Sequence, residues 1–469
     1  MSTGLVSKDT IVALATSPGA DGAIAVIRLS GPEAIGITNV VFKGKDLINQ
    51  PSHTIHFGTI RDGEEIIDEV LVSLFKGPHS YTKENVVEIS THNSRYIIER
   101  VISLLIKKGA RAAQAGEFTL RAFLNGGMDL SQAEAVADLI ASENKASHDI
   151  AMNQMRGGIS NKLQEMREQL INFTALLELE LDFGEEDVEF ADRTQFETLI
   201  RELKTHVAKL IQSFAYGNAI KQGVPVAIIG KPNAGKSTLL NTLLDEERAI
   251  VSDIAGTTRD TIEESINLDG ITFRFIDTAG LRETIDTIEA IGVTKAKEKV
   301  RQAKVLLYLY DDTDSIAQEV ITQVKELYFG GLVVILVRNK IDLQGGYHPN
   351  IMDTTITDEL FPRYSDSLVA ISAKDSDSVD GLKNILLDKI RDMAVDDQQI
   401  ITNTRHVEAL QYALDALVQV EHGLAMQLPG DLLAHHIRDA LRHISSITGD
   451  IDVDRDILGT IFGKFCIGK

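Results

Sequence analysis

Short β-rich runs and one helical segment share the first part of the chain. Residues 1–124 contain the apolar runs AIAVIRLS, EVLVSLF and VVEIS. One segment, RYIIERVISLLIKKG, instead repeats its apolar positions every three to four residues, and its last glycine suits a helix C-cap. The mixture predicts a compact α+β domain.

From Ser131 the apolar spacing becomes helical, and Ser131 with Glu134 predicts a capping box at the start of this stretch. A heptad seam follows, made by Ile159, Leu163, Met166, Leu170, Phe173 and Leu177. We interpret the seam as the core of a helical bundle rather than a ligand site, because packing alone requires such residues at these steps.

Between residues 219 and 395 strands and helices alternate. The apolar runs VPVAIIG, FRFID, VLLYLY and LVVILVRN are separated by helix-like segments, which is typical of a parallel sheet covered on both faces. Helices resume after Thr404 in VEALQYALDALVQV and DLLAHHIRDALRHI. Because the helical stretches on both sides have matching character, we predict one helical domain, split in sequence, with a doubly wound α/β domain inserted into it.

Composition narrows the setting in which the chain works. Its 469 residues are 43% apolar and 25% charged, enough for about three domains. The single cysteine, Cys466, excludes an internal disulfide, and no signal-like or membrane-spanning apolar run is visible, so we expect a cytoplasmic protein. A net charge of −22 would repel RNA over most of the surface, so any RNA must be held by a local basic patch or a second protein.

A phosphate loop is predicted at Gly230–Ser237 (GKPNAGKS), which follows an apolar strand and opens a helix. Its glycines let backbone N–H groups surround a β-phosphate at the helix N-terminus. Lys236 would neutralise the β and γ oxygens, and Ser237 would ligate Mg²⁺. Taken alone, the loop indicates only a nucleoside triphosphate.

Two motifs at strand ends predict that the base is guanine. Asn339–Asp342 (NKID) ends LVVILVRN, and the Asp342 carboxylate can accept two hydrogen bonds from guanine N1 and N2, a donor pair that adenine lacks. Asn339 and Lys340 would support the loop and cover the ring. Ser372–Lys374 (SAK) would supply an amide to guanine O6.

The switch segments are predicted on either side of the strand FRFID. Asp277–Gly280 (DTAG) would reach magnesium through water and the γ-phosphate through an amide. Gly256–Asp260 (GTTRD) lies where a first switch belongs, and Thr258 is the candidate second hydroxyl ligand of Mg²⁺.

The water-orienting group is less clear from the residues, because Leu281 follows DTAG where Ras-type GTPases place a glutamine. Three acidic residues and two possible charge stabilisers stay open: Glu283, Asp286 and Glu289, and Arg259 and Arg282. Each of them is also compatible with a solvated switch position.

The strings GKPNAGKS, GTTRD, DTAGLRET, NKID and the terminal FCIGK resemble the MnmE (TrmE) family of tRNA-modification GTPases. The match covers essentially the whole chain and includes GPHSYTKENVVEIS and GEFTLRAFLNGGMDLSQAEAVADLI. The resemblance implies a multidomain chain of α/β and α+β parts. A P-loop GTPase domain with a mostly parallel sheet (219–395) would be inserted in an all-helical domain (125–218 and 396–469), preceded by an α+β folate-binding dimerisation domain (1–124).

The resemblance also implies an activity. The chain would be a potassium-stimulated GTP hydrolase that, in a heterotetramer with an FAD-dependent MnmG-type partner, modifies carbon 5 of the wobble uridine (position 34) of certain tRNAs. GTP-driven dimerisation of the nucleotide domains would gate the reaction. The implied cofactors are GTP or GDP, Mg²⁺, K⁺ and 5-formyl-tetrahydrofolate or another one-carbon tetrahydrofolate. The implied partners are a second copy, the flavoprotein and a tRNA substrate, without a membrane.

Residue roles follow from the same resemblance. The K⁺ ligands would be Asn233, Ser252, Ile254 and Thr257, supplying positive charge where other GTPases use an arginine. Glu289 would orient the water, with Lys236 and Thr258 completing the catalytic set. The expected GTP contacts are Asn233, Ala234, Gly235, Lys236, Ser237, Thr238, Ser252, Asp253, Ile254, Ala255, Gly256, Thr257, Thr258, Asp277, Thr278, Ala279, Gly280, Asn339, Lys340, Asp342, Ser372, Ala373 and Lys374.

For folate, the resemblance assigns Arg28, Glu88 and Lys469, with Arg28 on the glutamate tail and Glu88 on the pterin edge. The chain departs from the family at Gly127, where relatives commonly carry lysine, which puts the cofactor's affinity in question. It also has His92-Asn93-Ser94 in place of His-Gly-Gly. Cys466 matches the family's terminal thiol, while a small buried side chain is the alternative reading.

Two other hypotheses stay open at this stage. A ribosome-assembly GTPase would share the nucleotide domain, although such proteins usually append a basic RNA-binding module and none is visible here. A free-standing folate-dependent transferase regulated by the GTPase would need residues 1–124 to be active alone.

Overall fold

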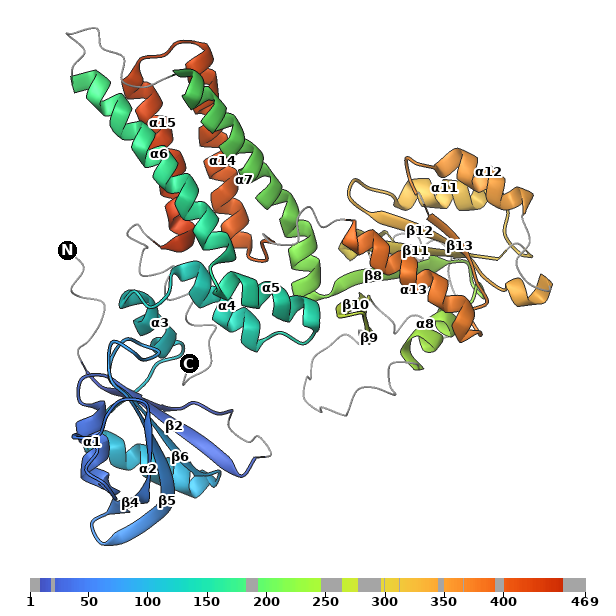
Figure 1. Cartoon of the computed structure of the whole chain (residues 1–469). Helices are drawn as coiled ribbons and strands as arrows, with labels where there is room; N and C mark the ends of the chain where they lie inside the picture. Colours follow the sequence, from blue (N-terminus) through green and yellow to red (C-terminus); the bar gives the residue numbers. More distant parts are fainter. Residues whose placement is uncertain are drawn as a thin grey trace. The chain divides into compact units, whose positions relative to one another are not determined.

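The computed structural model describes residues 9–17, 22–182, 193–245, 264–276, 297–298, 300–311, 313–344, 350–365, 367–392 and 400–449. The chain forms two compact units (Figure 1). One comprises Met1–Ala141, Ala151–Ile200 and Tyr412–Lys469, and the other Ser142–Ile150 and Arg201–Gln411. Within the described part of the chain, no helix is both long and apolar enough to cross a bilayer.

A seven-stranded, mostly antiparallel sheet forms the amino-terminal part, as the β-rich runs predicted. Its strands in spatial order are β3 (Phe42–Lys43), β4 (Thr54–Asp62), β5 (Glu65–Phe75), β6 (Val86–His92), β2 (Ile24–Ser30), β1 (Ile11–Leu14) and β7 (Arg111–Ala112). The helices α1 (Ala34–Val41) and α2 (Arg95–Lys107) pack on one face and bury its apolar side chains (Figure 1). Gly109 follows α2 with a φ of 114°, consistent with the predicted C-terminal glycine.

Among the residues that the structure describes, those of the same unit cover the opposite face of this sheet only in part. The helix α3 (Glu117–Leu124) packs Phe118 against the β1 end. Farther along, Ile55, Phe57 and Leu71 are 66%, 67% and 46% exposed. Phe57 and Leu71 are direct partners across β4 and β5, so their side chains form one apolar patch.

The helical part uses segments from before and after the nucleotide domain. Its elements are α4 (Leu130–Ile140), α5 (Lys145–Met155), α6 (Gly158–Asp182), α7 (Arg193–Gln222), α14 (Thr404–Ala425) and α15 (Gly430–Thr448). The helix α6 packs against α15, where Arg167 Nε donates to Ser445 Oγ at 3.1 Å. This pairing confirms the prediction of one helical domain split in sequence.

The heptad seam is confirmed as core where its side chains are described. Ile159, Leu163, Met166 and Leu170 are at most 3% exposed. Phe173 is 9% exposed and stacks on Phe196 of α7, with ring centroids 3.8 Å apart. The side chain of Leu177 lies outside the described part.

The cap of α4 differs from the prediction. Asp129 is the N-cap: its carboxylate accepts from the Gln132 amide at 2.8 Å, and the Gln132 side chain accepts from the Asp129 amide at 2.9 Å. The predicted box of Ser131 and Glu134 is wrong because Ser131 lies inside the helix. Ser131 is fully buried, and its hydroxyl meets the Gln154 side-chain amide at 3.2 Å.

The nucleotide domain is a six-stranded sheet. Its strands in spatial order are β13 (Ser367–Ala370), β12 (Val333–Arg338), β11 (Val305–Tyr310), β8 (Val224–Gly230), β10 (Ile271–Phe275) and β9 (Glu264–Leu268). All neighbours are parallel except β9, which confirms the mostly parallel prediction. The strand β8 lies between β10 and β11. Its carboxyl end is therefore at the topological switch point of the sheet, where ligands bind in such folds.

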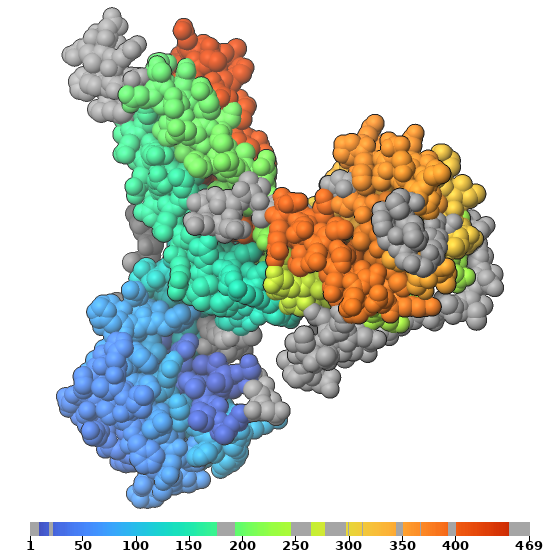
Figure 2. All heavy atoms as spheres, turned by 45° about the vertical axis from the view of Figure 1, so that its right-hand side comes forward, coloured from blue at the N-terminus to red at the C-terminus, as the bar shows by residue number. Residues whose placement is uncertain are grey.

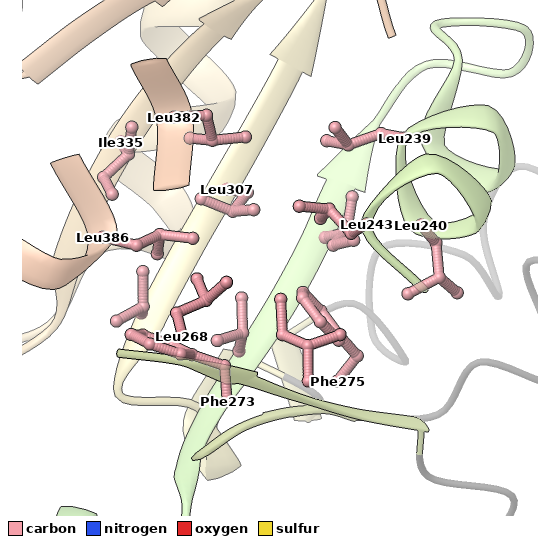
Figure 3. Packing of buried hydrophobic residues seen from close by; sticks show 14 of the residues in the cluster. Leu239, Leu240, Leu243, Leu268, Phe273, Phe275, Leu307, Ile335, Leu382 and Leu386 are labelled. Carbon is pink, nitrogen blue, oxygen red and sulfur yellow. The ribbon is translucent and has the colours of Figure 1, made fainter. Parts of the chain in front are cut away.

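Helices cover both faces of this sheet, as the buried apolar runs predicted. On one face lie α8 (Lys236–Asp245) and α13 (Ser376–Arg391), and Figure 3 shows Leu243 and Leu386 packing toward the strand residue Leu307. On the other face lie α11 (Ala317–Leu327) and α12 (Ile351–Leu360). The helices α12 and α13 contribute to the orange surface of this unit (Figure 2).

Candidate nucleotide site

The phosphate loop, Gly230–Ser237, links the end of β8 to the start of α8. Asn233 and Gly235 have φ angles of 62° and 98°, so the loop bends through the left-handed region. Glycine is required at Gly235, because a Cβ there would lie 2.0 Å from Asn339 Nδ2. The phosphate loop therefore packs directly on Asn339, the first residue of the NKID motif.

Lys236 folds back over the phosphate loop. Its ammonium donates to the carbonyls of Gly230 at 2.8 Å and Lys231 at 2.7 Å. Burial lowers the pKa of this ammonium. The positive charge of Lys236 would neutralise the oxygens of a phosphate placed in the loop, which is the role predicted for this residue. Ser237 follows it in the first turn of α8, where the backbone N–H groups of a helix N-terminus can bind an anion.

The outer side of the phosphate loop is also held. Lys231 Nζ donates to the carbonyl of Asp314 at 3.1 Å and forms an ion pair with Glu319 in the first turn of α11. Lys231 thus links the phosphate loop to α11, which covers the sheet face opposite α8.

A single pocket joins the phosphate loop to both base motifs. Its lining residues are Asn233, Gly235, Thr238, Asn339, Lys340, Asp342, Leu343, Ser372, Ala373 and Lys374. Nine of these ten are residues that the sequence singled out. The exception is Leu343, which is 65% exposed and offers an apolar surface to a base. An apolar residue immediately after NKID was its only sequence signal.

Asn339 connects the loops that meet in this pocket. Its side chain donates to the Ala234 carbonyl at 2.7 Å and accepts from the Ala373 amide at 2.9 Å, and the residue is 3% exposed. Ser372 Oγ donates to Asp342 Oδ1 at 2.9 Å and so orients the carboxylate. Phosphate and base ends of one nucleotide would therefore be held by one connected set of loops.

Two acidic residues that the sequence reasoning missed hold residues in or next to the pocket motifs. Asp311, at the end of β11, accepts from Lys340 Nζ at 2.5 Å. Asp353, in α12, accepts from Arg338 Nη1 at 2.5 Å and from the Tyr310 hydroxyl at 2.6 Å. No local motif signals these contacts, because each joins residues at least 15 positions apart.

Several predicted site residues lie outside the described residues. They are Ser252, Asp253, Ile254, Ala255, Gly256, Thr257, Thr258, Asp277, Thr278, Ala279, Gly280, Glu289, Lys469 and Cys466, together with the alternatives Arg259, Arg282, Glu283 and Asp286. Of the residues predicted to hold Mg²⁺ and K⁺, the described part of the chain includes Ser237 for Mg²⁺ and Asn233 for K⁺. Both side chains belong to the phosphate loop, and hydroxyl and amide oxygens are donors that such cations accept.

The two predicted folate residues of the described chain lie together on the open sheet face. Arg28 and Glu88 are cross-strand partners, and Arg28 Nε donates to Glu88 Oε1 at 2.8 Å. The guanidinium lies 5.5 Å from the Tyr81 ring and 5.7 Å from the Phe118 ring. Burial raises the pKa of the Tyr81 hydroxyl. Sequence reasoning missed both aromatic residues.

Two departures from the family also have a structural setting. A Cβ on Gly127 would lie 3.3 Å from Lys83 Cε, so a lysine stem already passes this position. His92 pairs through Nδ1 with the buried Asp68 at 2.7 Å.

Comparisons with known proteins agree with this architecture. A family model described as "MnmE helical domain" matches residues 130–466, and one described as "GTP-binding protein TrmE N-terminus" matches residues 10–127. Proteins called tRNA modification GTPase MnmE from Cytophaga hutchinsonii and Flavobacterium psychrophilum are 54% and 52% identical, covering 100% and 99% of this chain and 100% of their own. A solved FeoB G domain from Methanococcus jannaschii, 21% identical, covers 36% of this chain and 97% of its own at a TM-score of 0.26, too low to carry an argument.

A helical-domain model that matches well over half of the chain, and relatives more than 50% identical along its whole length, lead to one conclusion. This chain belongs to the MnmE family of tRNA modification GTPases.

Proposed function

We propose that the chain hydrolyses GTP in the pocket between the ends of β8 and β12 and uses this cycle to drive tRNA modification. The observation that carries the proposal is the Asn339 bridge between Ala234 and Ala373, beside a carboxylate, Asp342, that Ser372 orients. This arrangement supports simultaneous binding of the phosphates and the guanine edge of one nucleotide.

In hydrolysis, water attacks the γ-phosphorus, the bond to the bridging oxygen breaks, and GDP and phosphate leave. Glu289 would orient the water, and Lys236 would stabilise charge on the β and γ oxygens. Mg²⁺ held by Ser237 and Thr258, and K⁺ held by Asn233, Ser252, Ile254 and Thr257, would supply further positive charge.

The base assignment is tested by Asp342→Asn in the full chain. The variant keeps one acceptor oxygen but replaces the other with an NH2 donor, so guanine N1 and N2 can no longer both donate to the side chain, and we expect GTP binding to weaken by about a hundredfold or more. Xanthosine triphosphate should bind it better than GTP, because its C2 carbonyl can accept from the new amide. Asp380→Asn, an exposed acid on α13, is the matched control. Unchanged GTP affinity in Asp342→Asn would refute the site.

The cation assignment is tested by turnover of the full chain in KCl and in NaCl. We expect GTP hydrolysis to be faster in potassium, and Asn233→Ala to remove the difference while leaving GTP binding within a few fold. Equal rates of the wild-type chain in the two salts would refute a potassium site at Asn233.

The homodimer is proposed to form through the open face of the amino-terminal sheet. The patch made by Ile55, Phe57 and Leu71 lies on the sheet face that also carries Arg28 and Glu88. A two-fold pair would bury the same patch on both copies. Phe57→Glu should produce monomers in sedimentation experiments, with Glu64→Gln as the surface control.

A one-carbon tetrahydrofolate is proposed to bind beside Arg28 and Glu88, with Lys469 as a further contact. The Tyr81 and Phe118 rings offer faces for a pterin, and Lys83 lies where Gly127 lacks a side chain. Equilibrium binding of 5-formyl-tetrahydrofolate should weaken in Arg28→Ala. Equal binding by wild type and variant would refute the site.

The modified substrate is proposed to be carbon 5 of the wobble uridine (position 34) of certain tRNAs. A cytoplasmic heterotetramer with an FAD-dependent MnmG-type protein would carry out the reaction. With a net charge of −22, the chain would leave most of the tRNA affinity to that partner. Mass analysis of wobble nucleosides in cells lacking this chain tests the proposal: complete modification there would refute it.

A further inference from the structure

Three consecutive side chains at the end of β12 are each held by a different element. Arg338 pairs with Asp353 of α12, Asn339 bridges the phosphate loop and Ala373, and Lys340 pairs with Asp311 at the end of β11. The guanine loop, defined here as residues 339–343, therefore starts from a fully anchored strand end.

Asp311 is itself fixed before it meets Lys340. Its Oδ1 accepts from the Thr313 amide at 2.8 Å and from the Thr313 hydroxyl at 2.6 Å, which leaves Oδ2 for Lys340 Nζ at 2.5 Å. The Asp311 side chain is only 4% exposed. Both carboxylate oxygens are used, so the carboxylate cannot turn away from Lys340.

The charge of Asp311 matches this geometry. Burial on its own would raise the pKa of Asp311, but the hydrogen bonds from Lys340 and Thr313 outweigh burial, and the pKa lies below its ordinary value. A charged acceptor makes the bond to Lys340 stronger than a neutral one would.

Lys340 needs such a partner. Its backbone has a φ of 65°, a left-handed conformation that is rare for a lysine, and its four-carbon stem has many rotamers. Lys340 lines the pocket beside Asp342 and Leu343. Held by Asp311, the stem keeps one position at the edge of the space for the base, and no rotamer search is needed when a nucleotide arrives.

We infer that Asp311 is a positioning residue of the guanine pocket, which acts through Lys340 and organises it for the nucleotide. The inference rests on the proposed guanine site. It predicts that Asp311 matters for nucleotide affinity and not for the chemical step, because Asp311 reaches the nucleotide only through Lys340.

The test is a double-mutant cycle on the full chain, with GDP affinity measured by fluorescence of a labelled GDP. Asp311→Asn should raise the dissociation constant about tenfold, the effect of losing one charge-assisted hydrogen bond. Lys340→Ala should raise it at least as much. The double variant should be within about twofold of Lys340→Ala alone, and kcat at saturating GTP should change less than twofold in Asp311→Asn.

Controls separate this role from a general effect on folding. Glu359→Gln removes an exposed pair with Lys325 in the same unit and should leave the affinity unchanged. Thr313→Val keeps the carboxylate but removes one bond that orients it, and should weaken GDP binding a few fold, an effect that Lys340→Ala abolishes. If Asp311→Asn does not fold, the GDP affinity of Thr313→Val, alone and combined with Lys340→Ala, tests whether Asp311 positions Lys340.

Two results would overturn the inference: unchanged GDP affinity in Asp311→Asn, or losses in Asp311→Asn and Lys340→Ala that multiply in the double variant. A wild-type chain that does not bind GDP would instead refute the proposed guanine site.

Discussion

Replacing Asn339 by alanine should loosen the whole nucleotide pocket. The amide of Asn339 makes two bonds, to the Ala234 carbonyl at 2.7 Å and from the Ala373 amide at 2.9 Å, at a position that is 3% exposed. Alanine removes both bonds and leaves the Ala234 carbonyl and the Ala373 amide without the Asn339 side chain as a partner. Each loss costs about 1–2 kcal/mol, so the pair costs about 2–4 kcal/mol.

This energy appears in full as a loss of GDP affinity only if it is lost in the nucleotide-bound state and not in the free protein. At about 1.4 kcal/mol for each factor of ten, about 2–4 kcal/mol corresponds to a dissociation constant for GDP raised by roughly 30- to 700-fold. Titration calorimetry of the full chain with GDP measures this loss, and thermal unfolding without nucleotide measures the part that destabilises the free protein.

Asn339→Asp separates the two bonds. The carboxylate can still accept from the Ala373 amide, but its other oxygen faces the Ala234 carbonyl, so two acceptors meet. The loss of GDP affinity in Asn339→Asp should therefore be at least as large as in Asn339→Ala. Gln318→Ala, an exposed change at the start of α11, is the control. GDP affinity within threefold of wild type in Asn339→Ala, together with an unchanged melting temperature, would refute the bridging role.

Further predictions concern the packing around both units. Asp353→Ala leaves the buried Arg338 without its carboxylate and should lower the free energy of unfolding by about 3–5 kcal/mol in urea titrations; a loss below about 1 kcal/mol would contradict this. Gly235→Ala should weaken GDP binding by about ten- to a hundredfold, because its Cβ would overlap Asn339 Nδ2, and wild-type affinity would contradict the close packing. Hydrogen bonding, chiefly to Arg111, lowers the pKa of Asp9 from 3.8 to about 2, so its stabilisation is complete above about pH 4 and is lost as the pH falls toward 2. The stability difference between wild type and Asp9→Asn should therefore shrink over that range, and a constant difference would argue against the ion pair.

Local patterns were enough to predict the fold class and the motifs of the pocket. Period-two and helical spacing predicted the strands and helices, since those patterns report which side of each element is buried. The phosphate loop, NKID and SAK could be assigned to one site because the carboxyl ends of parallel strands meet at one edge of a sheet.

Sequence patterns did not identify the N-cap of α4, because more than one residue suits that position. Asp129 and Ser131 are both good cap residues, and Asp129 caps α4 because Ser131 is buried against Gln154. That choice depends on Gln154, which lies 23 residues farther along the chain, and local spacing does not encode this contact.

The supports behind the pocket show the same limit. Asp311, Asp353 and Leu343 belong to no motif, and the two carboxylates pair with Lys340 and Arg338, residues distant from them in the sequence. Burial makes the difference: a carboxylate at a strand end is solvated by default, and it becomes part of the site only when the fold buries it beside a specific cation. Residue spacing placed the groups expected to touch the nucleotide, whereas packing in three dimensions selected the groups that hold them still.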